Sequence, residues 1–148
     1  MLYFGEYRIK KGYAVMSDHA PAPTMTDCVA IKLILVVEDD EDIGSFLIQA
    51  IHQETAHQAI HHTTAYRALE AVKNITPHLF ILDYNLPDMN GLELYDQLQT
   101  FEHLKNSLTI LISAYSPLLV EIRKRRILFL RKPFDLTRLL TIIEKALA

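Results

Sequence analysis

The sequence predicts an α/β domain, a parallel sheet of five strands with helices on both of its faces. Five short apolar runs are spread along the chain, at residues 33–37, 58–61, 79–82, 108–112 and 127–130. Most of them lack polar alternation, which is typical of strands buried on both faces. Segments of helical periodicity separate them, and strands that alternate with helices form a parallel sheet with helices on both faces.

The helices are predicted from apolar residues that recur at helical spacing. After the first strand, Asp40 or Glu41 can cap a helix whose apolar face runs from Ile43 to Ile51. A loop with Pro87 and Gly91 precedes a later helix. Further helices are expected at residues 65–73, 92–98 and 136–147.

Composition narrows the class of protein. Half of the 148 residues are apolar, 22% are charged, and the net charge of -3 gives no basic surface for nucleic acid. No apolar run is long enough to cross a membrane, and the N-terminus lacks the apolar core of a signal peptide. Cys28 is the only cysteine, which fits a reducing compartment. We therefore expect a cytoplasmic protein that binds neither nucleic acid nor membrane.

The first 30 residues differ from the rest. Residues 17–27 are rich in turn-forming residues and show no periodicity, so we expect 1–30 to be a flexible extension and 31–148 to be the domain. Met16 and Met25 are alternative starts to Met1. A second interpretation of the aromatic and basic segment before Met16 is a docking peptide for a partner.

Residues capable of chemistry follow the predicted strands. Glu38 and Asp39 come after the first strand, and Asp83 follows the third. Ser113 follows the fourth, and Lys132 lies two residues beyond the fifth. In an open parallel sheet the ligand site lies beyond the carboxyl ends of the strands. The sequence therefore predicts that these five side chains share one site.

The chemistry of this set points to phosphoryl transfer. Three carboxylates at one edge repel each other unless a cation lies among them, and Mg2+ is a hard cation that also binds phosphate oxygens. Lys132 adds a fixed positive charge, and the Ser113 hydroxyl can donate to a phosphoryl oxygen. Asp83 can then act as a nucleophile for phosphorus. The chain has no glycine-rich phosphate loop, so no nucleotide is indicated.

Four segments resemble the motifs of the bacterial response-regulator receiver domains. They are ILVVEDD at 34–40, LDYNLPDMNG at 82–91, ISA at 112–114 and RKPF at 131–134. Their order and their spacing, 44 positions from Asp39 to Asp83 and 30 from Asp83 to Ser113, are typical of that family. The resemblance covers about residues 32–148 and implies a flavodoxin-like fold with strand order 2-1-3-4-5.

The resemblance also implies a metal site and a phosphoacceptor. Glu38 and Asp39 match the acidic pair that holds Mg2+, and Asp83 matches the phosphorylated aspartate. The backbone carbonyl of Asn85 matches the third protein ligand of the metal.

Further roles follow from the same match. Ser113 corresponds to the switch hydroxyl, Phe129 to the aromatic switch residue and Lys132 to the lysine that contacts the phosphate. The Lys132–Pro133 peptide bond is expected to be cis.

The chain departs from the family pattern after Ser113. Only 19 positions separate Ser113 from Lys132, fewer than is usual in receivers, and residues 117–126 run almost directly into the last strand. We expect a shortened or irregular fourth helix, which puts the usual output surface in doubt. Tyr115 is bulky at a position that flanks the phosphate in the family, and we expect it to prolong the phosphorylated state by restricting water.

Two other clusters have simpler interpretations. His52, His57, His61 and His62 show no metal-ligand spacing, and the neighbours His61 and His62 would point to opposite faces of a strand. The basic run 123–126 is more typical of a solvated helix face than of a nucleic-acid site.

Three functions compete. The first is an interaction module that takes phosphate on Asp83 from a histidine kinase or phosphotransfer protein, catalyses only its own phosphoryl transfer and dephosphorylation, and signals to a downstream protein. The second is a phosphohydrolase, but Asn85 stands where that class needs a second acid. The third is a pseudo-receiver that binds partners without phosphorylation. Because the last predicted helix ends near Ala148, no output domain is expected, and homodimerisation stays open.

Overall fold

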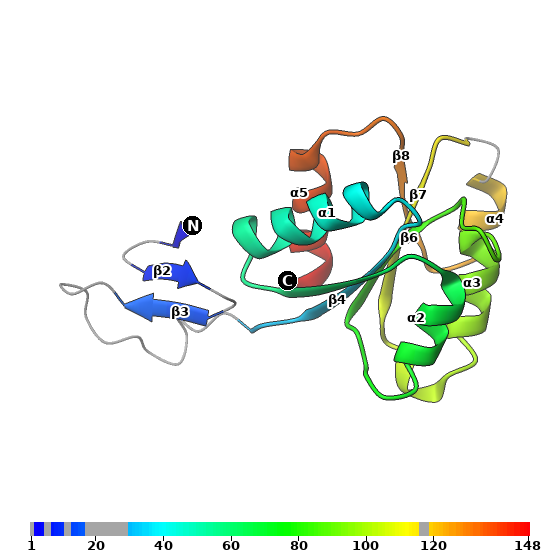
Figure 1. The fold of residues 1–148 in the computed structure, drawn as a ribbon, viewed down its shortest axis with the longest axis horizontal. Helices are drawn as coiled ribbons and strands as arrows, with labels where there is room; N and C mark the ends of the chain where they lie inside the picture. The colour runs from blue at the N-terminus through cyan, green and yellow to red at the C-terminus, as the bar shows by residue number, and fades with distance from the viewer. Residues whose placement is uncertain (1, 5–6, 11–12, 17–29, 116–118) are drawn as a thin grey trace.

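The structure is a computed structural model that describes residues 2–4, 7–10, 13–16, 30–115 and 119–148 (Figure 1). Its main sheet has five parallel strands, in the order β5-β4-β6-β7-β8. The strands are β4 (Leu33–Val37), β5 (Gln58–His62), β6 (Leu79–Asp83), β7 (Leu108–Ser113) and β8 (Leu128–Arg131). Counted along the domain, this is the order 2-1-3-4-5, so the predicted fold is confirmed.

Within the residues that the structure describes, α-helices cover both faces of this sheet (Figure 1). They are α1 (Glu41–Glu54), α2 (Ala65–Ala71), α3 (Gly91–Leu98), α4 (Leu119–Arg123) and α5 (Leu136–Leu147). A short 3-10 helix, η2 (Glu102–Leu104), follows α3. Helices α1 and α5 pack on one face, and α2, α3 and α4 pack on the other. The three longest begin at side-chain caps: Asp40 before α1, Asn90 before α3 and Asp135 before α5.

The apolar core lies on both sides of the sheet. Alternate residues of β4 point in opposite directions, so Ile34 and Val36 join the cluster under α1 and α5, whereas Leu35 and Val37 join the cluster under α2 and α3. All four are fully buried. This two-sided burial explains why the strand is apolar throughout, and it fixes the edge at which the strand ends.

Within the described residues, helix α4 is short, as expected. It has five residues, and Ile122 is its buried side chain. After it, Arg125 makes a two-pronged ion pair with Asp96 of α3, with N–O distances of 2.8 and 2.9 Å. Arg125 also donates to the Glu121 carbonyl oxygen at 2.8 Å. The segment between α4 and β8 is therefore attached to α3 by a partly buried charge.

A second, antiparallel sheet precedes the domain. It contains β1 (Leu2–Phe4), β2 (Tyr7–Lys10) and β3 (Tyr13–Met16), strands that the sequence pattern had not indicated. Residues 17–29, on which the expected flexible extension chiefly rests, lie outside the described residues, so its flexibility stays a prediction. Within the described part of the chain, no helix is long and apolar enough to cross a membrane.

Candidate functional site

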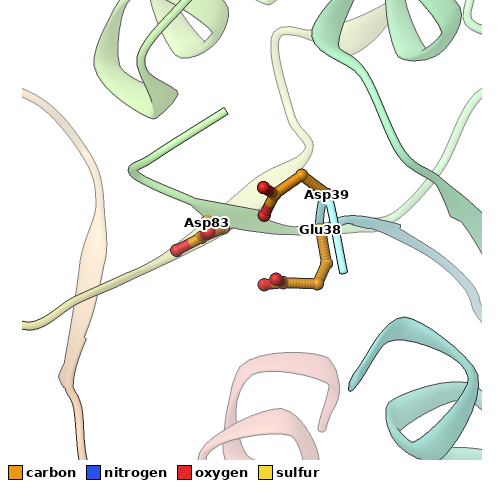
Figure 2. Close-up of side chains that lie close together, drawn as sticks. All are labelled: Glu38, Asp39 and Asp83. Carbon is orange, nitrogen blue, oxygen red and sulfur yellow. The ribbon is translucent and has the colours of Figure 1, made fainter. Parts of the chain in front are cut away.

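Three carboxylates meet at the carboxyl edge of the sheet. Glu38 and Asp39 follow β4, and Asp83 is the last residue of the neighbouring β6 (Figure 2). Because Val37 pairs with Leu82, the two strands end side by side. One oxygen from each carboxylate lies within 4.8 Å of the others. Glu38 and Asp83 are buried, whereas Asp39 is exposed.

This arrangement is electrostatically unfavourable without a cation. Burial, and then the charge of Asp83, raise the pKa of Glu38 to about 7, although Lys132 acts in the opposite direction. Burial also raises the pKa of Asp83, while the hydrogen bond from Lys132 lowers it. A divalent cation among these oxygens would favour the ionised form of both.

Lys132 supplies one positive charge to the cluster. Its Nζ lies 3.0 Å from Oδ1 of Asp83, in an ion pair whose carboxylate side is almost fully buried. The Lys132 backbone N–H donates to the carbonyl oxygen of Ser113 at 3.0 Å, which extends the contact between β7 and β8. The peptide bond from Lys132 to Pro133 is cis.

Ser113 ends β7 with its side chain 1% exposed. Its Oγ accepts a hydrogen bond from the backbone N–H of Tyr115 at 3.0 Å. The hydroxyl is thus held by the loop that follows it, and the side chain of Tyr115 is exposed.

Asn85 and Phe129 occupy different surroundings. Asn85 is exposed, and its backbone N–H donates to the Asp83 carboxylate. Phe129 is half-buried on β8 and packs against the apolar cluster under α2, α3 and α4. The structure therefore brings Glu38, Asp39, Asp83 and Lys132 together and places Phe129 apart from them. The roles given to Asn85 and Phe129 stay predictions.

Two residues near the site were not identified from the sequence as parts of it. His61 Nε2 lies 2.7 Å from the carbonyl oxygen of Glu38. Asp88, in the loop after Asp83, accepts from the backbone N–H groups of Ala65 and Tyr66, at 3.1 and 2.7 Å, and so joins this loop to the start of α2. Asp88 lies inside one of the recognised motifs, but no local signal marks His61.

Two other histidines of the predicted cluster, His52 and His57, bind the backbone. His57 Nδ1 accepts from the Lys32 N–H at 3.1 Å, and His52 Nε2 accepts from the Ala59 N–H at 2.9 Å. Among the described residues, the acidic triad is the group of side chains with metal-ligand proximity. Its hard oxygen donors suit Mg2+ better than a metal that prefers nitrogen or sulfur.

Comparisons with known proteins agree with this geometry. The regulatory protein AtoC of Escherichia coli K12 is 28% identical over 121 residues, which are 80% of this chain, and the chain spans only about a quarter of AtoC. Sporulation initiation phosphotransferase F of Bacillus subtilis 168 is 26% identical over 117 residues, 77% of this chain and 92% of that protein. A CheY-like receiver domain from Methanospirillum hungatei JF-1 superposes with a TM-score of 0.72 at 26% identity, over 80% of this chain and 94% of that one.

The family model of the response regulator receiver domain matches residues 34–144, which contain every residue of the site described above. The chain belongs to the response regulator receiver domain family.

Proposed function

We propose that this domain accepts a phosphoryl group on Asp83, with Mg2+ as cofactor, and passes the signal on by protein contact. The observation that carries the proposal is the position of Asp83, a buried carboxylate between the acidic pair and Lys132 Nζ at 3.0 Å. Family membership supports a role in two-component signalling. The name of the Bacillus relative, a phosphotransferase, supports a place in a phosphorelay.

The residues fit the cofactor. Glu38, Asp39 and Asp83 would hold Mg2+ through carboxylate oxygens, with the Asn85 carbonyl as a further ligand. When bound, Mg2+ supplies positive charge to the phosphoryl oxygens. Its positive charge would also oppose the burial and the repulsion from Asp83 that together raise the pKa of Glu38.

The transfer itself needs a nucleophile and charge neutralisation. An oxygen of Asp83 attacks the phosphorus of a phosphohistidine, a P–O bond forms and the P–N bond breaks. The imidazole keeps the bonding electron pair and takes up a proton. Lys132 neutralises negative charge on Asp83 and the phosphoryl oxygens. The Ser113 hydroxyl gives up its hydrogen bond with the Tyr115 N–H and donates to a phosphoryl oxygen instead. Water later attacks phosphorus, which releases inorganic phosphate and restores the carboxylate.

The partners follow from this chemistry. The donor is a histidine kinase or a phosphotransfer protein, and the receiver of the signal is a downstream protein. Phe129 would report the movement of Ser113, since its strand β8 pairs with β7 through Ser113 and Arg131. A second candidate function is a pseudo-receiver that binds partners without phosphorylation. The short α4 favours keeping this candidate, because a shorter helix changes the usual output surface of the family.

One measurement separates these functions. The protein is incubated with acetyl phosphate and MgCl2, and its intact mass is followed over time. A gain of one phosphate that is lost in Asp83→Asn and kept in Asp42→Asn, an exposed aspartate outside the cluster, supports the proposal. An unchanged mass in the wild-type protein favours the pseudo-receiver. Turnover of phosphomonoesters would instead indicate a phosphohydrolase.

A further inference from the structure

The end of β5 and the start of α1 meet at an unusually close contact. Gly44, in the first turns of α1, is buried, and a methyl group added to it would overlap the imidazole ring of His61. His61 is the fourth residue of β5 and is half-buried. The missing side chain at Gly44 therefore provides the space in which the His61 ring lies.

The ring makes one specific hydrogen bond from that space. His61 Nε2 lies 2.7 Å from the carbonyl oxygen of Glu38. A carbonyl oxygen only accepts, so Nε2 carries the proton and donates. The Glu38 backbone N–H donates in turn to the carbonyl oxygen of His62 at 3.1 Å. The last two residues of β5 thus bind both backbone polar groups of Glu38.

The hydrogen bond from His61 to Glu38 lies just beyond the end of the pairing between β4 and β5. Regular pairing between β4 and β5 ends with Val37 and His62, so the Glu38 carbonyl lies one residue beyond the ladder. That carbonyl belongs to the planar peptide unit between Glu38 and Asp39. Holding it restricts the rotation on both sides of the unit, and therefore the directions of both carboxylates. Asp39 is exposed, so packing contributes little to holding it.

We propose that His61 is a positioning residue for the divalent-cation site. It fixes the Glu38–Asp39 peptide so that both carboxylates converge on Asp83. Gly44 leaves the space that the His61 ring needs for this contact. The inference rests on the proposed function, because it assigns His61 a part in binding the same Mg2+. His61 itself does not touch the metal or the phosphoryl group. It acts through the backbone of Glu38.

The test is a titration of the full chain with MgCl2, followed by the amide signals of the site in 1H–15N NMR spectra. His61→Leu removes the donor and Gly44→Ala displaces the ring without changing it. His61→Gln keeps an N–H donor at a similar reach. His62→Leu is the matched control, because it changes the neighbouring histidine while leaving its backbone carbonyl in place for Glu38.

We expect His61→Leu and Gly44→Ala to weaken Mg2+ binding about tenfold, because that is the usual effect of losing a group that holds a metal ligand in place. The Mg2+ affinities of His61→Gln and His62→Leu should stay within about threefold of the wild-type value. Metal-free protein gives an independent readout. Its long-range 1H–15N spectrum should show a proton on His61 Nε2 that is protected from exchange, and Gly44→Ala should abolish that protection.

Unchanged Mg2+ affinity in His61→Leu would overturn the inference while leaving the proposed function intact. So would a loss that His61→Gln does not recover. Should His61→Leu fail to fold, Gly44→Ala decides the matter, since a displaced ring with unchanged Mg2+ affinity contradicts a positioning role. A wild-type protein that shows no Mg2+-dependent shifts would instead overturn the proposed function, and this inference with it.

Discussion

The buried position of Glu38 leads to a prediction about stability. Its pKa in the folded chain is about 7, compared with an ordinary value of 4.5. Because each pKa unit corresponds to about 1.4 kcal/mol, ionised Glu38 lowers the free energy of unfolding of the metal-free protein by about 3 kcal/mol above pH 7. The penalty is absent below pH 4.5, where the residue is protonated in both states, and it grows as the pH rises toward 7.

Glu38→Gln should therefore stabilise the metal-free protein. The glutamine keeps the oxygen that accepts from the Asp40 N–H at 3.3 Å and removes the charge. We expect a gain in the free energy of unfolding of about 3 kcal/mol at pH 8 and close to none at pH 4.5. Saturating MgCl2 should reverse the ranking, because the metal binds the folded wild-type protein and stabilises it.

Urea unfolding followed by circular dichroism measures this difference, at several pH values, in EDTA and in MgCl2. Glu41→Gln is the control, an exposed glutamate in the first turn of α1 whose replacement should change the free energy of unfolding by less than about 1 kcal/mol. A stabilisation by Glu38→Gln that is the same at pH 5 and pH 8 would refute the reasoning, since a packing effect and not the buried charge would then be responsible.

Three further outcomes follow from single contacts. Arg125→Ala removes the ion pair with Asp96 and should lower the free energy of unfolding by about 1 kcal/mol, with faster hydrogen exchange confined to α4 and its neighbours. Burial lowers the pKa of His57, and the neutral ring accepts a hydrogen bond from the Lys32 N–H. The stability that His57 contributes is therefore present above pH 6.5 and is lost as the pH falls through the pKa of His57 in the folded protein. His57→Gln should flatten that part of the stability profile in urea unfolding, and an unchanged profile would contradict this. Tyr115→Ala should shorten the lifetime of phosphorylated protein in intact-mass time courses, because Tyr115 is a bulky exposed residue whose backbone N–H binds the Ser113 hydroxyl; an equal lifetime would exclude a shielding role.

The fold could be predicted from the sequence because the hydrophobic patterns that indicate its strands and helices are local. A strand buried on both faces has to be apolar at every position, so an apolar run such as 79–82 can be recognised as a strand from its sequence alone. The site followed from topology, since residues placed directly after parallel strands are brought to one edge. Glu38, Asp39 and Asp83 could therefore be grouped before any distance was known, and their oxygens lie within 4.8 Å.

The contacts that the sequence did not reveal join distant segments. Gly44 and His61 are 17 positions apart, and nothing in either segment indicates that one accommodates the other. Arg125 and Asp96 are 29 positions apart, and each alone is an ordinary surface charge. Such pairs depend on the distance and angle between packed elements, which hydrophobic periodicity does not encode.

The two buried carboxylates of the site, Glu38 and Asp83, have different neighbours. Both lose hydration, but only Asp83 receives a direct hydrogen bond from Lys132, at 3.0 Å. Glu38 has the repulsion of Asp83 added to its burial, and the pKa of Glu38 rises to about 7. Burial therefore raises the pKa of both carboxyls, and the hydrogen bond from Lys132 opposes that rise at Asp83. A metal ion bound among these oxygens would favour the ionised form of Glu38 and would displace the proton that burial and the charge of Asp83 favour there.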